Sequence, residues 1–127
     1  MDITVKITIQ APGMTTVEDT TVLPVEARDI ITVTVPAAAV NQEVDVSPAS
    51  LVDQSLLYIR ASAYPTSLTP TYKVGLTSNP AIKLDAPHLY MGSQDSALPA
   101  AVDKLFFSNP GAADVVVTLV VGRDATP

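Results

Sequence analysis

The stretch Lys104–Gly122, which reads KLFFSNPGAADVVVTLVVG, gives the strongest indication of how this chain folds. Two apolar runs flank the turn sequence Asn109-Pro110-Gly111. Proline presets the backbone for the first central position of a turn, and glycine tolerates a positive φ at the second. The run Val115–Val121 is almost entirely β-branched, which favours a strand over a helix. The stretch therefore predicts a β-hairpin.

Both faces of this predicted hairpin are apolar. One face carries Val115, Val117, Leu119 and Val121, and on the other run it carries Leu105 and Phe107. The opposite face carries Phe106, Val116 and Val120. A strand in a two-layer domain needs only one apolar face, because water meets the other. We therefore expect Phe106, Val116 and Val120 to take part in self-association. A hairpin lying between two layers of its own domain would explain the same pattern.

Length, composition and charge narrow the classes of protein. A chain of 127 residues without a linker-like segment is expected to form one domain over residues 1–127. It has no cysteine, so disulfides and thiolate metal sites are excluded. A net charge of −6 opposes binding to nucleic acid. The start of the chain lacks a signal-peptide pattern, and no run is apolar enough to cross a membrane as a helix.

The charged fraction is low, at 16%. With so few charged residues, we expect partners to cover part of the protein surface. The alternative is a monomer whose surface is rich in small residues.

Short alternations of apolar and polar residues recur along the rest of the chain and predict further strands. These are expected at Asp2–Gln10, Arg28–Val35, Val44–Val46, Leu56–Tyr64, Thr71–Thr77 and Ala81–Leu84. Two segments, Met14–Glu26 and Asp85–Val102, are expected to be irregular. Eleven prolines spread along the chain interrupt every candidate helix. About eight short antiparallel strands at close spacing predict an all-β fold, a β-sandwich of jelly-roll type.

Residues that could carry chemistry are few. His88 is the single histidine, and although Asp85 is close in sequence, no nucleophile-elbow sequence accompanies it. We expect it to be a packing or loop residue. A calcium site would require aspartates such as Asp85, Asp95 and Asp103 to converge, and solvated turn aspartates are the simpler reading. The sequence therefore predicts no catalytic residue, no metal site, no cofactor and no enzymatic activity.

A recognition surface is predicted on the strand that contains Tyr58, Arg60 and Tyr64. Residues two apart in a strand project side by side, so these three side chains are expected to share a face. Tyrosine and arginine are enriched where proteins bind one another, because they combine a large contact area with a polar group. The chain's own loops could equally cover this face. Stacking of a sugar on the tyrosine rings is a further possibility.

The last part of the chain resembles a known group of proteins. The segments that carry the resemblance are Thr71–Gly75, Ile82–Pro87, Leu105–Asn109 and Ala113–Asp124. Together they resemble small β-rich virion proteins of tailed bacteriophages, among them the proteins that decorate or cement the capsid. The resemblance implies a jelly-roll-like domain, a homo-oligomer that is often a trimer, and attachment to a capsid or tail. It implies no catalytic motif.

These observations predict a structural protein that decorates or cements a phage capsid. Its partners would be a capsid protein or another virion protein and further copies of itself, with no nucleic acid and no membrane involved. It would be made in the bacterial cytoplasm and end in the virion. The segments Met14–Glu26 and Pro87–Val102 would serve as docking loops. A carbohydrate- or receptor-binding module of a phage tail is the second hypothesis.

Overall fold

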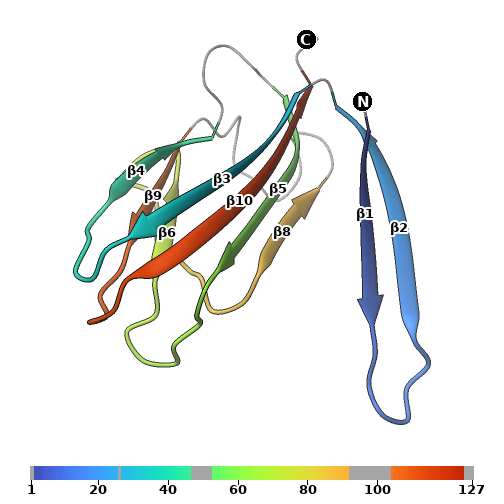
Figure 1. The fold of residues 1–127 in the computed structure, drawn as a ribbon, viewed down its shortest axis with the longest axis horizontal. Helices are drawn as coiled ribbons and strands as arrows, with labels where there is room; N and C mark the ends of the chain where they lie inside the picture. Colours follow the sequence, from blue (N-terminus) through green and yellow to red (C-terminus); the bar gives the residue numbers. More distant parts are fainter. Residues whose placement is uncertain (1, 26, 47–52, 92–103, 125–127) are drawn as a thin grey trace.

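The computed structural model describes residues 2–25, 27–46, 53–91 and 104–124 (Figure 1). This part of the chain is all-β and contains ten strands in antiparallel sheets, without a helix. The strands are β1 (Asp2–Ile9), β2 (Val17–Pro24), β3 (Ala27–Val35), β4 (Gln42–Asp45), β5 (Asp53–Ala61), β6 (Thr71–Val74), β7 (Ile82–Lys83), β8 (His88–Met91), β9 (Lys104–Ser108) and β10 (Val115–Asp124). The predicted all-β sandwich is therefore confirmed.

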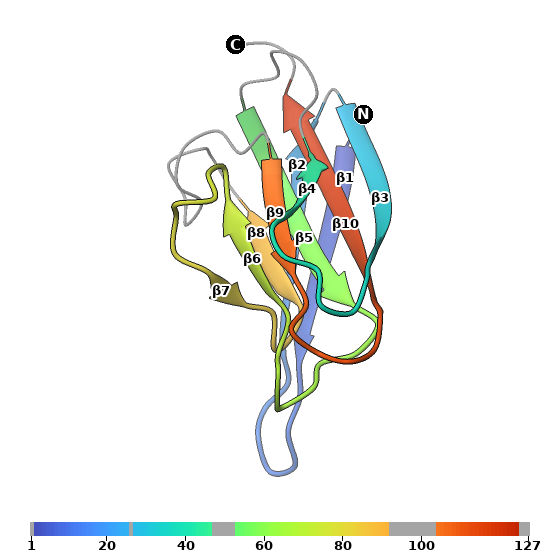
Figure 2. The same ribbon diagram turned by 90° about the vertical axis from the view of Figure 1, so that its left-hand side faces the viewer.

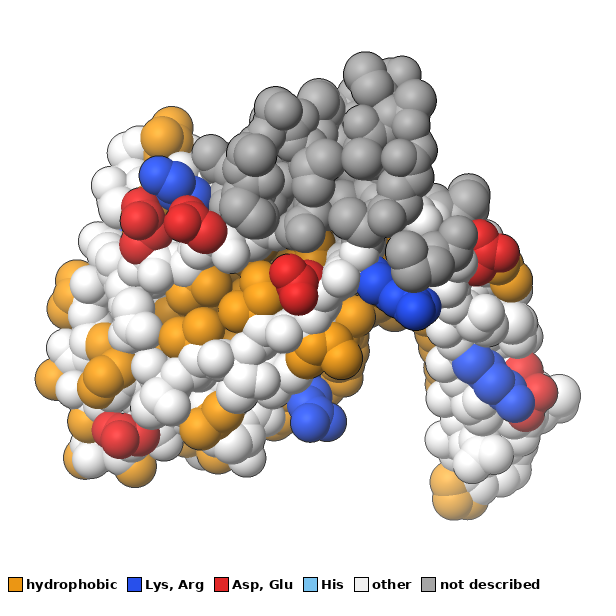
Figure 3. Space-filling view, turned by 45° about the horizontal axis from the view of Figure 1, so that its top comes forward, with side chains coloured by type: hydrophobic (Ala, Val, Ile, Leu, Met, Phe, Trp, Pro, Cys, Tyr) orange, Lys and Arg blue, Asp and Glu red, His pale blue; other side chains and the backbone are white. Residues whose placement is uncertain are grey.

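The strands form three layers (Figures 1 and 2). Two four-stranded sheets face each other, one in the order β3-β10-β5-β8, here called sheet I, and one in the order β4-β9-β6-β7, here called sheet II. Strands β1 and β2 form a separate two-stranded sheet, here called the arm, on the outer side of sheet I. Figure 3 shows the hollow between the arm and the sandwich.

The stretch Lys104–Gly122 supplies a central strand to each sheet of the sandwich. Strand β9 lies between β4 and β6, and β10 lies between β3 and β5. The predicted hairpin is therefore wrong, because β9 and β10 belong to different sheets and do not pair with each other. The turn between them crosses from one layer to the other. Their inward faces meet in the core, as a sandwich requires.

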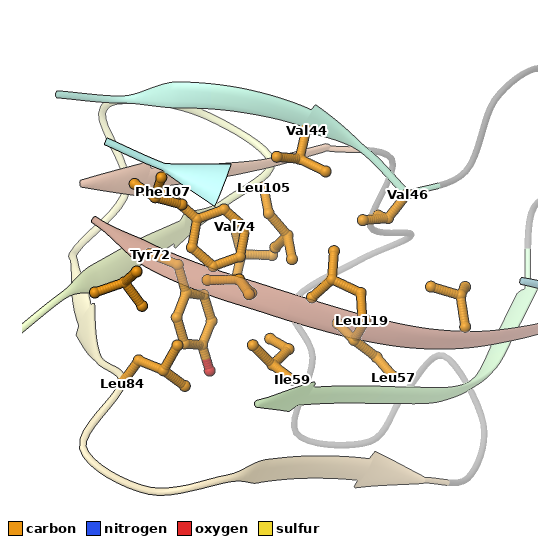
Figure 4. Close-up of a cluster of buried hydrophobic side chains, with 14 residues drawn as sticks. Val44, Val46, Leu57, Ile59, Tyr72, Val74, Leu84, Leu105, Phe107 and Leu119 are labelled. Atoms are coloured by element: carbon orange, nitrogen blue, oxygen red, sulfur yellow. The ribbon is translucent and has the colours of Figure 1, made fainter. Parts of the chain in front are cut away.

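The core lies between the two sheets and follows the alternation of each strand (Figure 4). From sheet I, Leu119 and Ile59 point inward, and from sheet II, Tyr72, Leu105 and Phe107 do so. All five are fully buried or nearly so. Each large side chain buried in this way stabilises the fold by roughly 1.5–3 kcal/mol. The face of β10 that begins at Val115 is thus the core face that the sequence predicts.

The crossover from β9 to β10 is fixed by the side chain of Asn109, which is only 1% exposed. Its amide nitrogen donates to the carbonyl oxygens of Val35 (3.2 Å) and Ala113 (2.8 Å), and its Oδ1 accepts from the backbone N–H of Gly111 (3.1 Å). The backbone N–H of Asn109 donates to the Ala39 carbonyl (2.9 Å). Gly111 does not adopt the positive φ expected for it. A β-carbon there would lie 3.2 Å from the Asn109 Oδ1, so the close approach explains the glycine.

Several strand boundaries differ from the prediction. Met14–Glu26 is not an irregular docking loop, because it contains β2, which pairs with β1 along its whole length. Its acidic and threonine residues face water, which hides the alternation that a buried strand would show. Asp85–Val102 begins with a short irregular stretch at 85–87 and continues into the short edge strand β8, whereas residues 92–102 of that predicted loop lie outside the described residues. β6 ends at Val74, so Leu76, expected to point inward, is 61% exposed in a turn.

Candidate interaction surface

The outer face of sheet I carries a continuous row of apolar side chains. The strand register places Val120 opposite both Ile30 and Tyr58, and Tyr58 opposite Leu89. Residues directly opposite one another in antiparallel strands project to the same face. Ile30, at the edge of this row, is 71% exposed. The sequence pattern alone placed these residues on separate strands, and only the register brings them together.

The arm contacts sheet I at its root. A β-carbon built on Gly122 would lie 2.8 Å from Cδ1 of Ile3 on β1 and 3.1 Å from Cγ1 of Val25. Real β-carbons do not tolerate the shorter distance, so glycine at this position lets the arm pack directly on β10. Leu56, beside Gly122 on β5, is buried beneath the same contact. The root of the arm is therefore part of the folded domain.

Along β1, from Ile3 to Thr8, the arm leaves an open groove against sheet I. The groove has a volume of about 690 Å³, and its lining residues are Ile3, Thr4, Val5, Lys6, Ile7 and Thr8 from β1, Leu56, Tyr58 and Val120 from sheet I, and Pro87 and Leu89 near β8. Its walls are mainly apolar, because the sheet contributes aliphatic and aromatic side chains and the arm contributes three aliphatic ones. This volume falls in the range of pockets that accept ligands or side chains.

The structure brings together four residues from the two predicted sets. Val120 and Tyr58 line the groove, while Arg60 and Val116 line a second hollow of about 340 Å³ on the same outer face. Val116 is 37% exposed, so neither layer of its own domain covers it fully. Residues predicted separately for self-association and for partner contact thus share one surface.

The other two predicted residues lie elsewhere. Phe106 is on the outer face of sheet II, between Glu43 and Lys73, and so is on the opposite side of the sandwich. Tyr64 does not share a face with Tyr58, because β5 ends at Ala61. Its ring packs against the core cluster, and its hydroxyl accepts a hydrogen bond from the backbone N–H of Ala61 at 3.0 Å. The predicted grouping is wrong for both residues.

A polar cluster links the two sheets at the side of the core. The Tyr72 hydroxyl lies 2.6 Å from Nδ1 of His88 and 2.6 Å from the hydroxyl of Tyr90. Burial, followed by the hydrogen bond to Tyr90, raises the pKa of Tyr72 well above its ordinary value. On the other side of the imidazole, Nε2 of His88 lies 3.7 Å from a carboxylate oxygen of Asp85.

This cluster consists of a phenol, an imidazole and a second phenol. Tyr72 belongs to sheet II, whereas His88 and Tyr90 belong to sheet I, so the hydrogen bonds tie the sheets together. The expectation that His88 is a packing residue agrees with this position. Its partners Tyr72 and Tyr90 could not be predicted from the sequence, because β8 has only four residues and shows no alternation.

Within the described ranges, no three histidine, cysteine, aspartate or glutamate side chains gather closely enough to hold a metal ion. The same part of the chain has no helix of sufficient length and apolar character to cross a membrane. Comparisons with protein-family models, with curated proteins and with solved structures found no match.

Proposed function

We propose that this chain is a structural protein of a phage virion that decorates or cements the capsid, and that it binds its partners through the outer face of sheet I. The observation that carries the proposal is the apolar surface that the arm leaves uncovered. Ile30 and Val116 are exposed there, and the groove beside them is lined mainly by apolar side chains. Contiguous exposed apolar surface is typical of sites where proteins bind one another.

The topology supports the jelly-roll assignment that the resemblance implies. In both sheets, early and late strands alternate, as the orders β3-β10-β5-β8 and β4-β9-β6-β7 show. Every connection from β3 to β10 passes from one sheet to the other, except the one between β6 and β7. Eight strands arranged as two Greek keys in two sheets define a jelly roll, an architecture that viral structural proteins use.

Roles for individual residues follow from their positions. Val116 and Val120 contribute apolar contact area, Tyr58 contributes an aromatic wall, and Arg60 contributes a charged group at the edge of the same surface. Phe106, on the far side of the sandwich, would contact a second neighbour in the assembly. No step of bond making or breaking is assigned to any residue, because the proposed function is binding.

The proposal is tested with capsids of the phage that carries this sequence, prepared without the protein. The purified chain is expected to sediment with the capsids at a fixed ratio and to raise the temperature at which they break open. Ile30→Asp should weaken this binding, because it places a charge in the apolar row. Leu76→Asp, at an equally exposed site away from sheet I, is the matched control. A chain that stays in the supernatant but binds glycans would contradict the proposal.

A further inference from the structure

The inner face of the arm is apolar along β1, and its burial decreases toward the tip, since Ile3, Val5 and Ile7 are half-buried and Ile9 is exposed. The register places Ile3 opposite Leu23 at the root and Ile9 opposite Val17 at the tip, all on the same face. Ile3 packs on sheet I, whereas Ile9 and Val17 are each 54% exposed. The arm therefore presents more apolar surface than its own sheet covers.

The position of the tip explains why the chain's own sheet leaves it uncovered. In Figures 1 and 2 the turn between β1 and β2 extends past the lower end of sheet I. This turn includes Met14, which is exposed. A surface that covers the tip must come from another molecule.

The charges of the arm and of sheet I are complementary. The described residues of the arm carry three carboxylates, those of Asp2, Glu18 and Asp19, against the single ammonium group of Lys6. The outer face of sheet I carries Arg28 and Arg60, both exposed. An acidic arm and a basic sheet face attract each other between molecules, which favours correct association.

We propose that the groove between the arm and sheet I receives the tip of the arm of a second copy of this chain. The close approach of Ile3 to Gly122 at the root shows that the arm packs directly on sheet I within one molecule. Exchange between copies extends this fit to the exposed tip. Each copy gives one arm and receives one; the contacts close when two copies exchange arms reciprocally or when a ring of copies completes its rotation. This inference rests on the proposed role in assembly and names the partner at that surface.

The first test measures the mass of the oligomer for variants with a polar arm tip. Ile9→Asp combined with Val17→Asp changes side chains that are already half exposed, so the monomer is expected to fold. We expect at least a tenfold weaker association, measured by sedimentation equilibrium, and a similar loss for Ile30→Asp on the sheet. Leu76→Asp, on the turn that follows strand β6, should leave association unchanged. Circular dichroism of each variant verifies the fold.

The second test identifies what lies beside the groove, at Ile30 on the exposed edge of the apolar row. The chain has no cysteine, so introduced thiols report single contacts. Chains carrying Met14→Cys are mixed with tagged chains carrying Ile30→Cys and are oxidised. A disulfide between tagged and untagged chains is expected, and Leu76→Cys in place of Ile30→Cys should give far less of it.

Three results would overturn the inference. An oligomer that persists with the polar tip shows assembly by another surface and leaves the proposed function standing. A disulfide that forms only within a chain carrying both Met14→Cys and Ile30→Cys shows that the arm folds onto its own sheet. A monomer that still binds capsids shows that the sheet face meets a capsid protein instead, whereas a monomer that binds no capsid also overturns the proposed function.

Discussion

Replacing Asn109 by alanine tests whether one buried amide fixes the crossover between the two sheets. The side chain makes three hydrogen bonds, two as a donor to the carbonyls of Val35 and Ala113 and one as an acceptor from Gly111. Alanine removes all three and leaves the Val35 carbonyl without this partner in a buried place. Leaving a buried polar group unpaired costs about 1–3 kcal/mol, and each ordinary hydrogen bond contributes about 1 kcal/mol.

The expected loss for Asn109→Ala is about 3 kcal/mol, since the bonds to Ala113 and Gly111 are only partly buried and water can replace part of them. For a domain of this size, that corresponds to a fall in Tm of about 10 °C. Asn109→Asp keeps the shape and the acceptor for Gly111, but it directs one carboxylate oxygen at the carbonyl oxygens of Val35 and Ala113. It should therefore be at least as destabilising.

The free energy of unfolding is measured by urea titration followed by circular dichroism, at one protein concentration because association shifts apparent stability. The matched control is Gln42→Ala. The Gln42 side chain also donates a hydrogen bond to a carbonyl oxygen near the end of β3, that of Thr34 (3.1 Å). This hydrogen bond is exposed to solvent. The control should lose less than about 0.5 kcal/mol. If Asn109→Ala loses no more than the control, the assigned role of Asn109 is wrong.

Further outcomes follow from the polar cluster and from the root of the arm. Tyr72→Phe should reduce stability by about 1–2 kcal/mol, because His88 and Tyr90 each lose a hydrogen-bond partner, and urea unfolding measures this. Burial raises the pKa of Tyr72 in the folded state, so its contribution is complete below the unfolded pKa of about 10 and is lost as pH rises above it. Tyr72→Phe should therefore lose stability less steeply than the native chain above that pH, and equal slopes would contradict the assignment. Gly122→Val should displace Ile3, with a cost of about 1–3 kcal/mol, and should speed hydrogen exchange in β1 more than in β9. Uniform exchange in both strands would show that the arm root is not held at this position.

The strands that form the core could be predicted because their alternation is strong. Leu57 and Ile59 on β5 and the Val115 face of β10 are buried as their spacing indicates. Two strands, β2 and β8, were not predicted, and each omission has a physical reason. β2 pairs only with β1 and is largely exposed, and Asp19 and Thr21 stand between Val17 and Leu23 on one of its faces, which breaks the apolar alternation in its sequence. β8 has four residues, too few for a pattern.

The candidate surface depends on contacts between distant parts of the chain, which local patterns do not record. The apolar residue Val120 pointed to a second covered face, but its neighbours Tyr58 and Ile30 are determined by strand register. The hairpin prediction for Lys104–Gly122 failed for the same reason. A turn between two apolar strands fits a hairpin and a crossing between layers equally well. Only the pairing of β10 with β3 and β5 distinguishes them.

The central claim is that copies of this chain associate through apolar surface that one copy leaves uncovered. The most direct measurement is the molar mass of the native chain by sedimentation equilibrium over its full range of soluble concentration. We predict a whole-number multiple of the 13.3 kDa chain mass, with two or more chains in each particle. A mass of 13.3 kDa that persists at the highest concentration would contradict the claim.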